Sequence, residues 1–136
     1  MTSISLRTMA ISAAMTLLAG MANAESVLQP VQVGDVTYIT GGVGSEERAE
    51  LEAAKKDYNL HIMNAGSGVE LAGGSQVIIH DAKGAEVLNV QSEPLLYVRL
   101  PAGTYQVEGI NEGDSKKQKV TVSAKQSAHI FFGWSR

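Results

Sequence analysis

Hydrophobic and polar positions alternate in short runs through the second half of the chain. Apolar and polar side chains alternate in 105–110, and the same period of two returns in 117–122. This period places successive side chains on opposite faces of a β-strand, so that one face can be buried. Turn-forming residues separate the runs about every 8 to 12 positions, as in small β-sandwiches. The pattern predicts seven strands, at 60–64, 76–80, 86–90, 95–100, 105–110, 117–122 and 129–134.

The segment 46–57 has a different pattern, which predicts one short amphipathic helix. Its narrow apolar stripe consists of Leu51, Ala54 and Tyr58, spaced as on one helix face. Ser45 stands where an N-cap is expected, and acidic residues at the start and lysines at the end suit the helix dipole. We expect this helix to pack lightly or to cover the edge of a sheet.

Residues 1–24 have the features of a secretory signal peptide. Arg7 provides a positive charge before the apolar stretch 9–19, which is too short to span a bilayer stably. A small-x-small cleavage site ends at Ala24, so the mature chain is expected to begin at Glu25. We therefore expect a periplasmic or secreted protein with no integral membrane segment after cleavage.

Three regions follow from these patterns. The signal peptide occupies 1–24, an N-terminal extension with the short helix occupies 25–58, and the β-sandwich occupies 59–136. Within the extension, valines and Ile39 are typical of a short extended piece, which Pro30 and Gly34 interrupt.

Composition excludes several classes of protein. With 11 basic and 14 acidic residues and a net charge of −3, the chain lacks the basic surplus of a nucleic-acid-binding protein. It has no cysteine, which excludes disulfides, thiolate metal sites and cysteine nucleophiles. Apolar residues make up 44% of the chain, enough to form a packed core.

Catalytic and metal-binding patterns are also missing from the sequence. His61, His80 and His129 fall on three different predicted strands, with none of the close spacing typical of zinc ligands, although neighbouring strands can bring such residues together. There is no G-x-S-x-G nucleophile turn and no grouped nucleophile, base and acid. We therefore expect no metal, no cofactor and no enzymatic activity.

The aromatic residues cluster near the end of the chain. Phe131 and Phe132 are neighbours, so one is expected to face the core and the other to face outward. Trp134 shares a face with Ile130 and Phe132, which favours a lid over the core. The alternative for Trp134 is a platform that stacks on sugar, with Tyr97 as a second candidate for ligand binding.

Three segments together resemble a carboxypeptidase-regulatory-like domain. They are 73–84, which ends in Asp-Ala-Lys-Gly, 100–109, which begins Leu-Pro-Ala-Gly-Thr-Tyr, and 119–122. In such domains a D-x-x-G hairpin is followed by L-P-x-G-x-Y-x-V. The resemblance covers 59–134 and implies a mainly β fold, a seven-stranded Greek-key sandwich of the transthyretin type, here preceded by one short helix.

The segments 38–48 and 57–60 also resemble short exported proteobacterial proteins of uncharacterised function that carry this domain. Neither resemblance implies a catalytic activity.

Four residues define the turns of this motif. Gly84 occupies a turn position that tolerates positive φ, and Pro101 presets φ for the turn that follows it. Gly103 is expected to supply a conformation that β-branched residues resist. Tyr105 then enters the sheet facing the core, where its hydroxyl needs a hydrogen-bond partner.

These observations favour a non-catalytic exported binding or accessory module. Its partner is expected to be a protein or a component of the cell envelope, bound through a sheet edge or face, and not a nucleic acid. The alternative is a carbohydrate-binding module, which needs at least two exposed aromatic rings in one plane, drawn from Tyr38, Tyr97 and Trp134.

The cleavage site gives the first testable prediction. Intact-mass analysis of the exported protein should give a chain that begins at Glu25, because signal peptidase cuts after the small-x-small site. A mass that retains the apolar stretch 9–19 would contradict this expectation.

Overall fold

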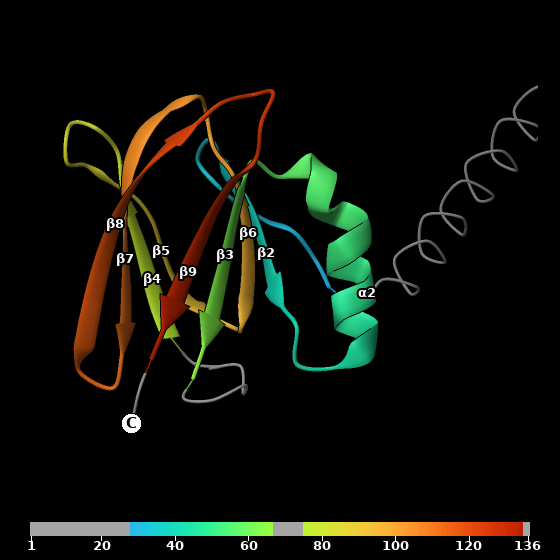
Figure 1. Ribbon diagram of the computed structural model, residues 1–136. Coiled ribbons are helices and arrows are strands. Elements are labelled where there is room, and N and C mark those ends of the chain that lie inside the picture. The colour runs from blue at the N-terminus through green and yellow to red at the C-terminus, as the bar shows by residue number, and fades with distance from the viewer. Residues whose placement is uncertain (1–27, 67–74, 135–136) are drawn as a thin grey trace, which may run out of the picture.

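The computed structural model describes residues 28–66 and 75–134, which form two β-sheets and one α-helix stacked as three layers (Figure 1). Five strands form sheet A: β1 Val31–Val33, β2 Val36–Gly41, β3 Leu60–Ala65, β6 Leu95–Arg99 and β9 Ala128–Gly133. Four strands form sheet B: β4 Ser75–His80, β5 Glu86–Ser92, β7 Gly103–Asn111 and β8 Asp114–Val122. The helical segments are α2, Ser45–Ala54, and the short 3₁₀ turn Lys55–Asp57.

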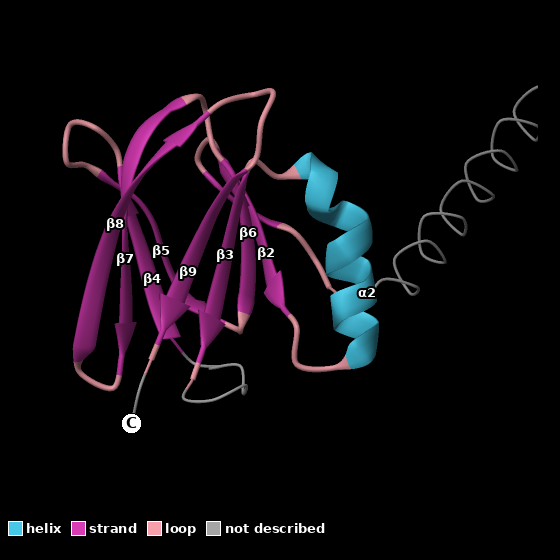
Figure 2. Ribbon diagram, viewed as in Figure 1, coloured by secondary structure: helices cyan, strands magenta, loops and turns pink. Residues whose placement is uncertain are grey.

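The strand orders show how the layers are built. Sheet A has the order β1-β2-β6-β3-β9, and sheet B has the order β5-β4-β7-β8. All pairs are antiparallel except β3 and β9, which run parallel. Helix α2 lies on the side of sheet A that faces away from sheet B, next to β2 (Figure 2).

The mainly β fold with two sheets and one short helix is confirmed, but a total of seven strands is not. The described residues contain nine strands, because the segment before residue 59 adds β1 and β2 to sheet A. Gly34 does not interrupt an extended piece; with a φ of 58° it forms the tight turn that pairs Val33 with Val36. The predicted extension therefore contributes two strands to the sandwich.

The main core lies between the two sheets. In sheet B, β4 alternates between buried and partly exposed residues along its whole length, whereas β8 is buried only at Val122. In sheet A, β3 and β6 instead each bury three successive residues, so both faces of these strands are covered. A second, smaller cluster between α2 and the outer face of sheet A explains this, and it consists of Ile39, Leu51, Tyr58 and Tyr97.

The start of α2 differs from the prediction. Gly44, and not Ser45, is the N-cap, and it makes no side-chain capping bond. The Glu47 carboxylate instead accepts hydrogen bonds from the backbone N–H groups of Gly42, at 3.0 Å, and Val43, at 3.2 Å. This carboxylate fixes the loop that leads into the helix, so a capping hydroxyl is not needed. The α-helix also ends at Ala54, and the predicted last turn is a 3₁₀ turn.

The hairpin between β4 and β5 closes through Asp81 and Gly84. Gly84 has a φ of 89°, as expected for its turn position, and donates its N–H to the carbonyl of Asp81 at 3.0 Å. The Asp81 carboxylate accepts the N–H groups of Lys83 and Ala85, at 2.9 and 3.0 Å. The D-x-x-G motif is therefore a side-chain-stabilised turn.

The Leu-Pro-Ala-Gly-Thr-Tyr motif forms a corner before β7. Tyr105 is buried, and its hydroxyl donates a hydrogen bond to the carbonyl of Pro101 at 2.6 Å, which is the partner that burial requires. Gly103 begins β7 with a φ of 159°. A Cβ at this position would lie 3.7 Å from the Tyr105 ring, at ordinary van der Waals contact.

The corner predicts a measurable stability loss. The change Tyr105→Phe removes the bond to Pro101 and should lower the free energy of unfolding by about 1 kcal/mol in urea denaturation. The control is Tyr38→Phe, because among the described residues the Tyr38 hydroxyl has no hydrogen-bond partner. An equal loss in both variants would contradict the role of the corner bond.

Candidate functional site

Helix α2 leaves part of the outer face of sheet A uncovered. It packs over β2 and β6 through Leu51, which is fully buried, while β3 and β9 extend beyond it (Figure 1). On these two strands Met63 and Phe131 are cross-strand neighbours, and 40% and 57% of their surfaces are exposed. Two large apolar side chains thus lie side by side in solvent.

A groove of about 270 Å³ separates these side chains from the end of the helical segment. We call it the histidine groove. Its lining comes from the 3₁₀ turn, β3, β6 and β9, and consists of Lys55, His61, Ile62, Met63, Leu95, Tyr97, His129, Ile130 and Phe131. The lining is mainly apolar, with a few polar groups, as in many binding sites for ligands or partner segments.

The parallel pairing of β3 with β9 brings two histidines together. His61 and His129 are register partners, and their ring centroids are 4.9 Å apart. On its other side the His61 ring lies against Tyr97, with centroids 4.6 Å apart. Only 7% of His61 is exposed, so it forms the floor of the groove.

Two backbone carbonyls fix the tautomer of His61. Its Nε2 atom lies 3.0 Å from the carbonyl oxygens of both Lys55 and Tyr58. Because a carbonyl only accepts hydrogen bonds, Nε2 carries the proton and Nδ1 presents a lone pair. Nδ1 is buried and has no hydrogen-bond partner among the described residues.

The surroundings of His61 also favour its neutral form. Burial lowers the pKa of His61, and the nearby His129 and Lys55 charges act in the same direction, against the two backbone hydrogen bonds, which raise it. Burial likewise raises the pKa of Tyr97, with a smaller effect in the same direction from Glu52. At neutral pH the groove therefore holds an uncharged imidazole and an uncharged phenol.

Trp134 is part of the core, as the lid interpretation expects. It is 3% exposed and stacks on Phe132, with ring centroids 5.9 Å apart. Its indole N–H donates to the Asn64 side-chain oxygen at 3.2 Å, and the Lys116 ammonium lies 5.3 Å from the ring centroid. No face of this ring is presented as a platform for sugar.

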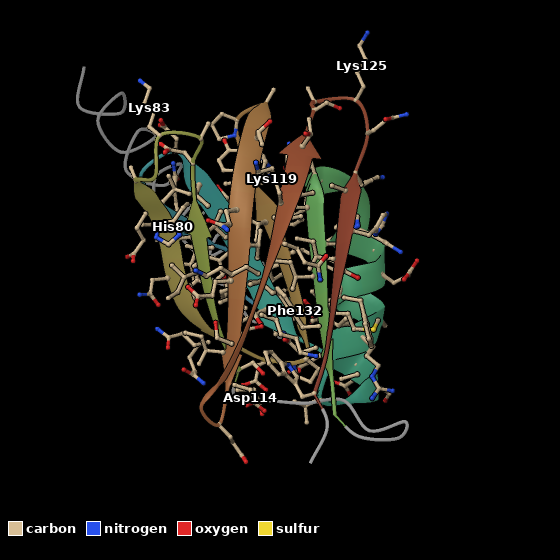
Figure 3. The ribbon with its side chains drawn as sticks, turned by 60° about the vertical axis from the view of Figure 1, so that its left-hand side comes forward. His80, Lys83, Asp114, Lys119, Lys125 and Phe132 are labelled. Carbon is tan, nitrogen blue, oxygen red and sulfur yellow. The ribbon has the colours of Figure 1, made fainter. Side chains whose placement is uncertain are left out.

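The other aromatic candidates do not supply such a platform. Tyr97 is buried beneath α2, and Tyr38 is half-buried. The expectation for the adjacent phenylalanines is confirmed. Phe132 is fully buried in the core between the sheets (Figure 3), and Phe131 is 57% exposed.

The remaining predicted residues lie away from the groove. Gly84, Pro101, Gly103 and Tyr105 form turns and corners of the fold, and none of them lines the histidine groove. The cleavage-site residues Ala24 and Glu25 lie outside the described residues.

Sequence analysis missed the pairing of His61 with His129. The two residues stand at the same register in β3 and β9, but only a prediction of parallel pairing between those strands would have revealed it. His80 remains separate, on β4, on the side of the molecule opposite α2 (Figure 3). Within residues 28–66 and 75–134 there is no group of three or more histidine, cysteine, aspartate or glutamate side chains placed to hold a metal ion.

Comparison with known proteins does not identify a family. No protein-family model matches the chain, and no curated protein is significantly similar to it. The carboxypeptidase-regulatory-like resemblance therefore stays a prediction. In the part of the chain that the structure describes, no helix is long and apolar enough to cross a membrane.

The burial of His61 predicts a pH-dependent stability. The folded-state pKa of His61 lies below the ordinary value of 6.5. The contribution of neutral His61 to the free energy of unfolding is therefore fully present above pH 6.5, and it is lost as the pH falls through the folded-state pKa. Urea denaturation at about pH 7.5 and about pH 5.5 should give a lower free energy of unfolding at the acidic pH. His61→Gln should reduce this difference and His80→Gln should keep it; an unchanged difference in His61→Gln would show that another group is responsible.

Proposed function

We propose that this protein is an exported, non-catalytic binding module that holds a protein of the cell envelope on the outer face of sheet A. In this proposal the sandwich is of the transthyretin-like, carboxypeptidase-regulatory-like type, and the signal peptide directs it to the periplasm or outside the cell. The partner contacts the histidine groove and the exposed pair Met63 and Phe131.

The exposure of Phe131 beside the groove is the observation that carries this proposal. Phe131 and Met63 are both exposed, are paired across β9 and β3, and border a mainly apolar groove. Exposed apolar patches of this kind are where partner proteins bind. Aromatic residues and methionine are enriched in the centres of such interfaces. The half of sheet A under α2 is already covered, so this surface is the uncovered remainder of the same face.

The charge of the groove indicates what the partner presents. Lys55 is a cation at one end of the groove, while Leu95 and Phe131 provide apolar contact. A partner segment with a large apolar side chain next to a carboxylate matches both features. The ammonium of Lys55 would then pair with that carboxylate at the border of the contact.

The face of sheet A is a better candidate than its edge. β9 is an edge strand, but two of its carbonyls already accept hydrogen bonds from side chains of β8. Gln118 donates to the carbonyl of Phe131 at 2.9 Å, and the Lys116 ammonium donates to that of Gly133. These side chains occupy positions that an added strand would need.

The lining of the groove also contains no serine or carboxylate nucleophile paired with a base. Its polar side chains are Lys55, His61, Tyr97 and His129, and none of its lining residues is a serine or a carboxylate. The imidazole of His61 is held by backbone carbonyls and is not hydrogen-bonded to a nucleophile. This composition supports binding without chemistry.

A charge placed on Phe131 tests the proposal. Tagged mature protein should capture a discrete partner from envelope extract, and purified partner should bind Phe131→Asp at least about tenfold more weakly, because a carboxylate would be buried in an apolar contact. The matched control is Val43→Asp, which alters another apolar residue, 66% exposed, in the loop before α2. Both variants should melt like the native protein.

Equal binding by the Phe131→Asp and native proteins would show that the partner does not use this face. Equal weakening by Val43→Asp would show that added negative charge alone, and not the groove, decides binding.

A further inference from the structure

The buried Nδ1 atom of His61 is the unexplained polar group of the groove. A buried acceptor without a partner costs free energy, and in native proteins such an atom often has a bound water or ion beside it. The opposite nitrogen is anchored by the carbonyls of Lys55 and Tyr58. Histidines that bind metals are oriented in this way, with the second ring nitrogen donating to a backbone carbonyl or carboxylate.

The neighbouring ring of His129 is placed to share an ion with His61. Two imidazoles whose nitrogens each lie about 2 Å from one ion, at a roughly tetrahedral angle, have ring centroids about 5 Å apart. The observed separation is 4.9 Å, with an angle of 62° between the rings. The centroid separation of His61 and His129 therefore matches that of two imidazoles that share one ion.

Met63 adds a thioether to the same place. It lies two residues after His61 on β3, so both side chains point to the same side of the sheet, and both line the groove. Imidazole and thioether are ligands that suit copper, and the thioether favours the softer Cu(I).

The charge in and around the groove also favours a monovalent ion. The ammonium of Lys55 lines the groove and repels a divalent cation more strongly than a monovalent one. Glu52 lines an adjoining hollow together with Lys55, Lys56 and both histidines, so its carboxylate offsets the charge of one of these two lysines.

We propose that the histidine groove binds one Cu(I) ion through His61 Nδ1 and the imidazole of His129, with the thioether of Met63 as third ligand. This assignment departs from the expectation, drawn from the sequence, that the protein holds no metal. It rests on the protein's own side chains and is independent of the proposed protein partner.

Competition with a chromophoric Cu(I) chelator tests this proposal. Untagged mature protein is titrated without oxygen, with ascorbate as reductant, and it should withdraw one Cu(I) per chain. His129→Gln and Met63→Leu should each weaken binding by more than about tenfold, since losing even a group that only orients a ligand has an effect of that size. His80→Gln is the matched control, because His80 lies on β4 in the other sheet, and it should bind like the native protein.

Thermal melts of the metal-free variants show that each one is folded, so that a loss of binding reports on the ligand. No withdrawal of Cu(I) by the native protein would overturn the proposal, and so would equal affinities of the native and His129→Gln proteins. Binding that is lost in His129→Gln but unchanged in Met63→Leu, with Zn(II) preferred to Cu(I), would replace the copper assignment. Because the titration uses the purified protein alone, its failure would leave the proposed partner surface standing.

Discussion

The need to cover both faces of sheet A determines the rest of this structure. Its strands β3 and β6 each bury three successive residues, so both of their faces are covered along that stretch. Sheet B packs on the inner face, whereas α2 covers the outer face only over β2 and β6, where Leu51 meets Ile39 and Tyr97. The helix is ten residues long, and the sheet extends past it. The exposed Phe131 and the histidine groove are direct consequences of that mismatch.

The parallel pairing of β3 with β9 is the second element on which the site depends. It joins the end of the chain to the strand that follows the helix, and it places His129 beside His61 and Phe131 beside Met63. The same pairing turns Phe132 and Trp134 inward, where they complete the core between the sheets. One register thus sets both the packing of the interior and the chemistry of the outer face.

Sequence patterns predicted the strands well and the site poorly, for physical reasons. Alternation and turn residues are local signals, so strands such as 76–80 and 105–110 were found within about two residues of their observed bounds. The β1–β2 hairpin was missed because a glycine such as Gly34 is equally typical of a break in a strand and of a turn between two strands. The pairing of His61 with His129 depends on contact between residues that are 68 positions apart in the sequence (129 − 61), which no local pattern encodes. The Trp134 lid was predictable because its neighbours Ile130 and Phe132 share its face.

Photo-crosslinking from residue 131 tests most directly whether the uncovered face of sheet A is the binding surface. A photoreactive phenylalanine analogue at this position, in cells that export the protein, should give one discrete adduct on illumination. The same analogue at position 43, which is also exposed but lies in the loop before α2, should give none. An adduct from position 43 alone, or equal labelling from both positions, would contradict the account.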